Sequence, residues 1–236
     1  MIKAVTLKIL FISDVYFPRI NGVSTSIRTF VKQMQAMGHD VHLIAPDYGK
    51  KTEDDAWIKR IPARKIYFDP EDKLMKFGAV IDTLSDLRKE KYDLIHMHTP
   101  FVAHYLGVKL AHLLDVPCVE TYHTFFEDYL HLYLPIIPKP IAKALARLIS
   151  QCQCNKVDAI VAPSQPMLHV LREYGITTKG EVVPTGLQAH SFEKADGKAF
   201  RAKYGIEQDR PMALFVGRVA FEKNIGFLLQ MWVHLI

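Results

Sequence analysis

The chain has 236 residues, of which 49% are apolar and 23% charged, a globular composition that excludes an intrinsically disordered chain. Its formal net charge of +5 favours anionic partners such as nucleotide-sugars, phosphates or an anionic membrane surface. Lysines and arginines are scattered, without a basic run interleaved with aromatic residues, so we expect no nucleic-acid partner. Three cysteines exclude a disulfide framework, and no apolar run reaches the roughly 20 residues that span a bilayer.

The first apolar run, from Leu7 to Ile12, is short and leads directly to Asp14. It predicts a buried first strand rather than a signal peptide. We therefore expect a cytoplasmic protein that can contact the inner face of the cell membrane peripherally. Cys152 and Cys154 are too close together for the usual zinc-binding pair, which favours reduced thiols.

Apolar runs of strand length then alternate with segments of helical periodicity. This alternation predicts a parallel sheet with right-handed crossovers, which is a doubly wound α/β domain of the Rossmann-like kind. Gly38 is expected to end the first helix. In chain order, the predicted strands are 7–13, 41–45, 94–98, 117–122, 159–162 and 181–183, and the predicted helices are 24–37, 72–89, 102–114, 141–152 and 165–174.

A domain boundary is predicted after Gly186, because a more polar stretch follows and a new apolar run begins at Pro211. We expect residues 1–186 to form an N-terminal domain, and 187–236 to form a linker and the incomplete start of a second α/β domain. One strand at 211–216 and one helix cannot enclose a core. The apolar side chains of this start would offer a docking surface for a partner chain: Leu214, Phe215, Phe227, Leu228 and Trp232.

The turn after the first strand contains Asn21 and Gly22, immediately before the first predicted helix. A glycine there lets backbone N–H groups approach a ligand, although an ordinary strand-to-helix turn explains the pair equally well. The turn lacks the G-x-G-x-x-G spacing of dinucleotide-binding enzymes, which argues against a dehydrogenase. Ligands in doubly wound folds bind at the carboxyl ends of the strands, where the following polar residues fall: His98, His123, Ser164, Thr185 and Gly186.

His96 and His98 share one face of a strand, because side chains alternate along it. With His123 they can in principle form a three-histidine metal site. We favour ligand-facing or hydrogen-bonding histidines, and we predict neither a metal nor a cofactor, since no other residue pattern calls for one. Glu127 and Asp128, in the loop that follows, are either polar surface or acceptor-binding residues.

Arg218 and Lys223 lie five residues apart across a predicted strand–turn–helix junction. A guanidinium fork and an ammonium at this spacing are suited to hold two phosphates. The alternative is a solvated pair on the surface.

Lys139, Lys143 and Arg147 follow one another at four-residue steps, with apolar residues on the other side of the predicted helix. A basic amphipathic helix of this kind can lie on an anionic membrane. A core-packed helix with a solvated basic face is the more common arrangement.

Six short motifs occur in the order in which one enzyme family has them: Phe17-Pro-x-x-Asn-Gly-Val23, His96-x-His-Thr-Pro100, Tyr122-His-Thr124, Ala162-Pro-Ser164, Pro184-Thr-Gly186 and Gly217-Arg-x-x-x-Glu-Lys-Asn224. On these motifs, the chain resembles the retaining glycosyltransferase family 4, or group 1, whose members have the two-domain GT-B fold. The stretch from Thr121 to His131 is similar to the bacterial branch that glucosylates diacylglycerol.

The resemblance implies roles for the quoted residues. His123 would hydrogen-bond the transferred sugar, and Gly22 and its loop would approach the donor diphosphate or the acceptor. Arg218 and Lys223 would neutralise the leaving nucleoside diphosphate in place of a metal. We expect four further residues to border the acceptor: Asn21, His98, Glu127 and Asp128.

The implied reaction is metal-independent, retaining transfer of a hexose from a nucleotide-sugar, UDP-glucose by resemblance, to a membrane lipid such as diacylglycerol. A phosphoinositol, a sugar phosphate or a polysaccharide is an alternative acceptor, and a non-catalytic acceptor-binding half that pairs with another polypeptide is an alternative function. Members of the family have a complete second Rossmann-like domain, in which two glutamates bind the donor. The sequence reaches Ile236 before such a pair of glutamates. We therefore expect weak or no activity from the chain alone.

Overall fold

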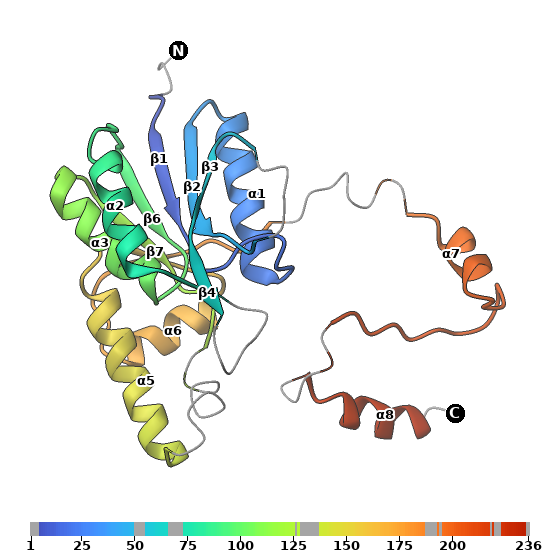
Figure 1. Ribbon diagram of the computed structural model, residues 1–236. Helices are drawn as coiled ribbons and strands as arrows, with labels where there is room; N and C mark the ends of the chain where they lie inside the picture. Colours follow the sequence, from blue (N-terminus) through green and yellow to red (C-terminus); the bar gives the residue numbers. More distant parts are fainter. Residues whose placement is uncertain are drawn as a thin grey trace. The chain divides into compact units, whose positions relative to one another are not determined.

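The chain forms two compact units, Met1–Gln188 and Ala189–Ile236. In Figure 1 the first unit is coloured from blue to orange and the second from orange to red. The computed structural model describes residues 5–49, 55–65, 73–125, 127, 137–186, 193, 195–217, 219 and 223–234.

A seven-stranded parallel sheet forms the first unit. From β1, the sheet extends through β2 and β3 on one side and through β6 to β9 on the other, so the order of connection reverses between β1 and β6 (Figure 1). In sheet order the strands are β3 (Ile58–Ile61), β2 (Asp40–Pro46), β1 (Lys8–Ile12), β6 (Leu94–Met97), β7 (Cys118–Thr121), β8 (Ala159–Ala162) and β9 (Lys179–Val182). The predicted doubly wound α/β fold is confirmed, and the carboxyl ends of β1 and β6 form the edge at which folds of this kind bind ligands.

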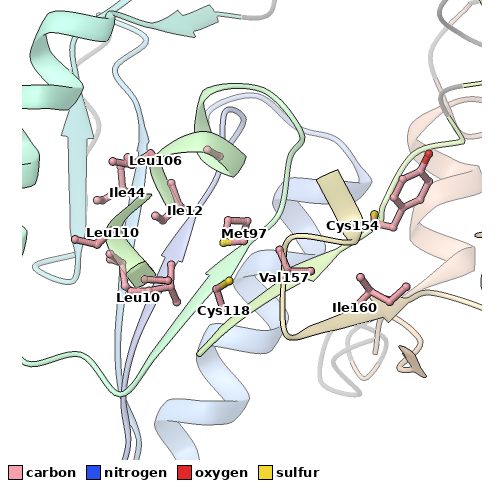
Figure 2. Close-up of a cluster of buried hydrophobic side chains, with 14 of the residues drawn as sticks. Leu10, Ile12, Ile44, Met97, Leu106, Leu110, Cys118, Cys154, Val157 and Ile160 are labelled. Carbon is pink, nitrogen blue, oxygen red and sulfur yellow. The ribbon is translucent and has the colours of Figure 1, made fainter. Parts of the chain in front are cut away.

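Helices cover the sheet and bury β1 on both of its faces. Leu10 and Ile12 belong to a large cluster with residues of α2 and α3, part of which Figure 2 shows, whereas Ile9 and Phe11 belong to a second cluster with α1. Burial on both faces explains why β1 is almost uniformly apolar instead of alternating. The helices of this unit are α1 (Gly22–Ala36), α2 (Phe77–Leu87), α3 (Val102–Leu114), α5 (Lys139–Cys154) and α6 (Gln165–Glu173).

The helix predicted at 72–89 is shorter than expected. Its first part forms a strand, β5 (Lys73–Met75), which pairs antiparallel with β4 (Ala63–Lys65), and α2 begins only at Phe77. The pairing with β4 satisfies the backbone groups of these residues, so the helical spacing of Leu74 does not decide their conformation.

Three short strands were not predicted, namely β3, β4 and β5. β3 has the sequence Ile58-Lys-Arg-Ile61, and its two central residues are charged. Short strands that carry charged residues are common at the edges of sheets, where they discourage pairing with other chains. Their weak apolar alternation explains why sequence periodicity misses them.

The second unit contains α7 (Gly197–Lys203) and α8 (Ile225–Val233). The strand predicted at 211–216 does not form, since a strand needs a hydrogen-bonded neighbour and the described residues of this unit contain none. Taken alone, this unit has no buried residue in its described part. No helix among the described residues of the chain has the length and apolar character needed to cross a membrane.

Candidate functional site

The candidate site lies at the carboxyl ends of β1, β6 and β7, which are neighbours in the sheet. Asp14 follows β1, His98 and Thr99 follow β6, and His123 follows β7. Ladder hydrogen bonds continue past the strand ends, because His98 N donates to Ile12 O at 3.0 Å. Residues 84 to 109 positions apart in the chain are thus fixed at one edge of the sheet.

Three histidines from β6 and the end of β7 stack on one face of the sheet. The ring centroids of His96 and His98 lie 4.2 Å apart with an interplanar angle of 27°, and those of His98 and His123 lie 5.3 Å apart at 26°. His98 Nδ1 is 3.0 Å from His123 Nε2, and His96 Nε2 is 2.7 Å from Thr121 Oγ1. The prediction that His96 and His98 share one face of a strand is therefore confirmed.

Burial keeps these imidazoles uncharged at neutral pH. It lowers the pKa of His96 to about 3 and that of His123 to about 4, and it lowers the pKa of His98 well below the usual value. In the described part of the chain, no group of three or more His, Cys, Asp or Glu side chains is arranged to hold a metal ion. The histidines are therefore available as neutral hydrogen-bonding groups, each with one donor and one acceptor nitrogen.

Asp14 is a site residue that the sequence analysis missed. Its Oδ2 accepts hydrogen bonds from Thr99 Oγ1 at 2.8 Å and from Ala103 N at 3.0 Å, so it satisfies the first turn of α3, whose own N-cap residue makes no side-chain cap bond. Burial raises the pKa of this carboxyl from 3.8 to about 6, and Oδ1 is buried without a partner among the described residues. The available signal was a carboxylate placed directly after a buried apolar strand.

The turn before α1 is built as a helix cap with open space around it. Asn21 Oδ1 accepts from Ser24 N at 2.8 Å, and an added Cβ on Gly22 would meet no atom within 4 Å. Thr185 Oγ1 donates to Ser26 Oγ at 3.1 Å, which brings the segment after β9 against the same helix. The predicted ligand-approach residues Asn21 and Gly22 therefore lie at an accessible helix N-terminus, whose first backbone N–H groups have no intrahelical partner.

Three side chains bind Glu127: two come from α5, and the third belongs to Tyr174, the residue that follows α6. Its carboxylate accepts from Arg147 Nε and Nη2, both at 2.9 Å, from Lys143 Nζ at 3.1 Å and from Tyr174 Oη at 2.5 Å. These bonds, led by those of Arg147, lower the pKa of Glu127 to about 2. A residue predicted to bind the acceptor and two residues predicted to contact the membrane thus meet one another, while Lys139 lies exposed at the start of α5.

Two of the predicted site residues, Asp128 and Arg218, lie outside the described residues. Lys223 is exposed in the second unit, two positions before α8 begins. Asn224, between Lys223 and α8, adopts a left-handed conformation with φ of 46°. The diphosphate clamp of Arg218 and Lys223 stays a prediction.

A doubly wound parallel sheet with polar side chains at the carboxyl ends of β1, β6 and β7 defines a domain of the Rossmann-like class. The chain belongs to Glycosyltransferase Family 4, whose family model matches residues 20–190. This confirms the family that the six motifs indicated.

The curated relatives of the chain include two enzymes with one name. The chain is 30% identical over 231 residues to the Alpha-monoglucosyldiacylglycerol synthase of Streptococcus pneumoniae, covering 94% of this chain and 51% of the relative. It is also 30% identical over 240 residues to the Alpha-monoglucosyldiacylglycerol synthase of Acholeplasma laidlawii, covering 97% of this chain and 60% of the relative. The chain therefore spans half to three fifths of the length of these relatives.

Among solved structures, the chain is similar to a glycosyltransferase from Rickettsia africae ESF-5, with a TM-score of 0.61. The match covers 97% of this chain and 57% of that one. At 16% sequence identity, this likeness shows the fold alone.

Proposed function

We propose that the chain is the acceptor-side part of a glycosyltransferase that moves glucose from UDP-glucose to diacylglycerol, with retention at the sugar. The observation that carries this proposal is the 30% identity to two Alpha-monoglucosyldiacylglycerol synthases, maintained over 94% and 97% of the chain. The family match over residues 20–190 supports the same reaction class.

In this proposal the donor sugar lies against the strand ends of the sheet. His123, partly exposed and uncharged, hydrogen-bonds a hydroxyl of the transferred sugar. The helix N-terminus of α1 and the open space at Gly22 receive the diphosphate. Arg218 and Lys223 supply the positive charge that stabilises the leaving nucleoside diphosphate.

The acceptor side is proposed to face the membrane through α5. Ile141 and Leu148 lie seven residues apart on this helix and are 57% and 55% exposed, although both are large apolar residues. Lys139 lies exposed at the N-terminal end of the same helix. A helix that carries exposed apolar side chains and an exposed lysine suits the boundary of an anionic bilayer. Lys143 and Arg147 would then divide their charge between Glu127 and the lipid headgroups.

The acceptor itself would be bordered by residues that follow the carboxyl ends of the strands. We propose that Asn21 and Asp128 contact it and that Glu127, 5% exposed, holds the loop before Asp128 in place. A lipid acceptor reaches such a site without leaving the bilayer, which is why the two surfaces are proposed together.

Radiolabelled glucose transfer tests the reaction. The chain is incubated with labelled UDP-glucose and phosphatidylglycerol vesicles that contain diacylglycerol, and the lipid extract is separated. From the chain alone we expect a low yield of labelled glucosyldiacylglycerol, and about 100-fold less from His123→Ala. His169→Gln, a change at an exposed side chain on α6, is the matched control and should keep the activity of the native chain.

Vesicle sedimentation provides a second readout that does not need turnover. We expect the chain to sediment with phosphatidylglycerol vesicles, and Lys139→Gln to weaken binding by about fivefold, since a basic residue near an anionic surface contributes about 1 kcal/mol. When inositol phosphate, a sugar phosphate or a glycan is added to the same reaction, label found only on that compound would replace diacylglycerol as the acceptor. If the chain neither transfers glucose nor binds vesicles, and it co-purifies with a stoichiometric partner protein, the result would favour a non-catalytic half that pairs with another polypeptide.

A further inference from the structure

His98 is buried in the sheet and contacts His123. His98 is 1% exposed, and its Nδ1 lies 3.0 Å from Nε2 of His123. His123 is only partly buried, and its other ring nitrogen has no hydrogen-bond partner in the part of the chain that the structure describes. Any effect of His98 on a ligand must therefore pass through His123.

The ring of His98 is held by its neighbours. It stacks on His96 with centroids 4.2 Å apart, and it contacts the ring of Phe11 in a tilted arrangement with centroids 4.6 Å apart. His96 is itself fixed by its 2.7 Å contact with Thr121 Oγ1. Packed aromatic rings on a central strand give His98 a defined orientation, which a loop residue such as His123 lacks on its own.

A single proton must lie between the two rings. Both imidazoles are neutral, so either His98 donates from Nδ1 or His123 donates from Nε2. The second arrangement would leave a buried N–H on Nε2 of His98, an atom that has no partner among the described residues. Buried donors without partners are rarer than buried acceptors without partners, which favours donation by His98.

The geometry points to His98 as a positioning residue that fixes the tautomer of His123. Because His123 Nε2 accepts the hydrogen bond from His98, the proton of His123 resides on Nδ1. His123 thereby presents a hydrogen-bond donor toward the ligand edge of the sheet, where it suits a hydroxyl or ether oxygen of a sugar and not an N–H group. The tautomer follows from the side-chain geometry alone, whereas the sugar as ligand rests on the proposed function.

Nitrogen chemical shifts test the tautomer directly. In the full chain labelled with 15N-histidine, long-range 1H–15N spectra distinguish a protonated from an unprotonated ring nitrogen. We expect His123 to show a protonated Nδ1 and an unprotonated Nε2 at pH 7, with its signals assigned by their loss in His123→Gln. A protonated Nε2 on His123 would overturn the inference without any variant of His98.

Two substitutions separate positioning from packing. His98→Leu removes the donor, and we expect the His123 shifts to move toward the average of the two tautomers. His98→Asn places an amide N–H near the position of Nδ1, and should restore the shifts of the native protein. His169→Gln, far from His123 in the chain and exposed, should leave these shifts unchanged. Shifts of His123 that are the same in all the variants would contradict a role for His98.

Kinetics connects the tautomer to the proposed reaction. With UDP-glucose and diacylglycerol vesicles, we expect His98→Leu to lower kcat about 10- to 100-fold with little change in the KM for the lipid, and His98→Asn to recover most of it. If the native chain shows the expected tautomer but neither transfers glucose nor binds the vesicles, the proposed function fails while the positioning role stands. If transfer is normal in His98→Leu, the positioning role has no consequence for catalysis and the inference is wrong in that respect.

Discussion

At the scale of single residues, Asp14 joins the ends of two neighbouring strands to the first turn of α3. Its backbone N–H donates to Thr99 Oγ1 at 2.7 Å, while the same hydroxyl donates to its Oδ2. The reciprocal pair and the bond from Ala103 N make this carboxyl the cap of a helix that belongs to another part of the chain. Such a long-range cap carries no local sequence signature.

The raised pKa of Asp14 predicts how stability changes with pH. Because the folded state holds its proton up to about pH 6 and the unfolded state releases it near 3.8, the stability due to this group falls as the pH rises through that window. Relative to Asp14→Asn, the free energy of unfolding of the native chain should fall by about 2 kcal/mol between pH 4 and pH 7. Urea unfolding at these two pH values measures it, and parallel pH profiles for both proteins would contradict it.

Glu127 should show the opposite dependence. Its pKa is lowered to about 2, so its stabilising contribution is complete above the unfolded value of 4.5 and is lost as the pH falls toward 2. We expect Glu127→Gln to cost on the order of 1–3 kcal/mol at pH 7, because Arg147 and Lys143 lose a shared carboxylate.

Chemical denaturation of Glu127→Gln at pH 7 and pH 3 measures this difference, which should shrink markedly at pH 3. Glu173→Gln is the matched control, since that glutamate is 62% exposed and its contact with His169 lies on the surface. The control should change stability by less than about 0.5 kcal/mol. An equal effect of the two substitutions would mean that the Glu127 contacts contribute no more than a surface ion pair.

At the scale of elements, the contact of α3 with β6 depends on a glycine. A Cβ on Gly107 would lie 2.4 Å from both Cγ and Sδ of Met97, and Met97 is fully buried. The helix can approach the strand that bears the histidines only because no side chain intervenes. The distance between α3 and the sheet, and with it the position of Ala103 at Asp14, is therefore set by this residue.

We expect Gly107→Ala to destabilise the chain by about 1–3 kcal/mol, because the buried methionine must leave its rotamer. Gly78→Ala is the control on α2, where an added Cβ meets no atom within 4 Å, and it should be neutral or stabilising by up to about 1 kcal/mol. Thermal unfolding of the two variants measures both effects. Equal stability of the two variants would show that Met97 yields without cost.

The same elements show what sequence periodicity can predict. The bounds of α3 and β8 agree with the prediction, and the other buried strands of the sheet agree within a few residues, because their apolar runs are long and their turns are clear. The charged edge strand β3 and the hairpin of β4 and β5 were missed, since their conformation depends on partners distant in sequence.

The candidate site was predictable only where its residues follow the alternation of a strand. His96 and His98 were found in this way, and His123 was found by its place at the end of the next strand, but the order in which the three rings stack depends on the sheet register. Glu127 looked like an acceptor residue because its ion-pair partners lie 16 and 20 positions away on α5. Long-range pairing of this kind cannot be read from a single sequence.

At the scale of the whole molecule, the two units differ in how much core they have. The first unit buries a sheet between helices, whereas the second has no buried residue in its described part when taken alone. α8 has nine residues, and isolated helices shorter than about 12 residues are marginal in water. Stability should therefore be distributed unevenly along the chain.

Hydrogen exchange followed by mass spectrometry measures this distribution. We expect amides of β1 and β6 to exchange only through global unfolding, and those of Ile225–Val233 to exchange close to the rate of an unfolded peptide, because few buried contacts oppose local opening. The helix α3 is the internal control, since it is equally helical but packed on the sheet. Protection of Ile225–Val233 comparable to that of α3 would show that its apolar side chains are covered in solution, and repeating the measurement at tenfold dilution would reveal whether a second copy provides that cover.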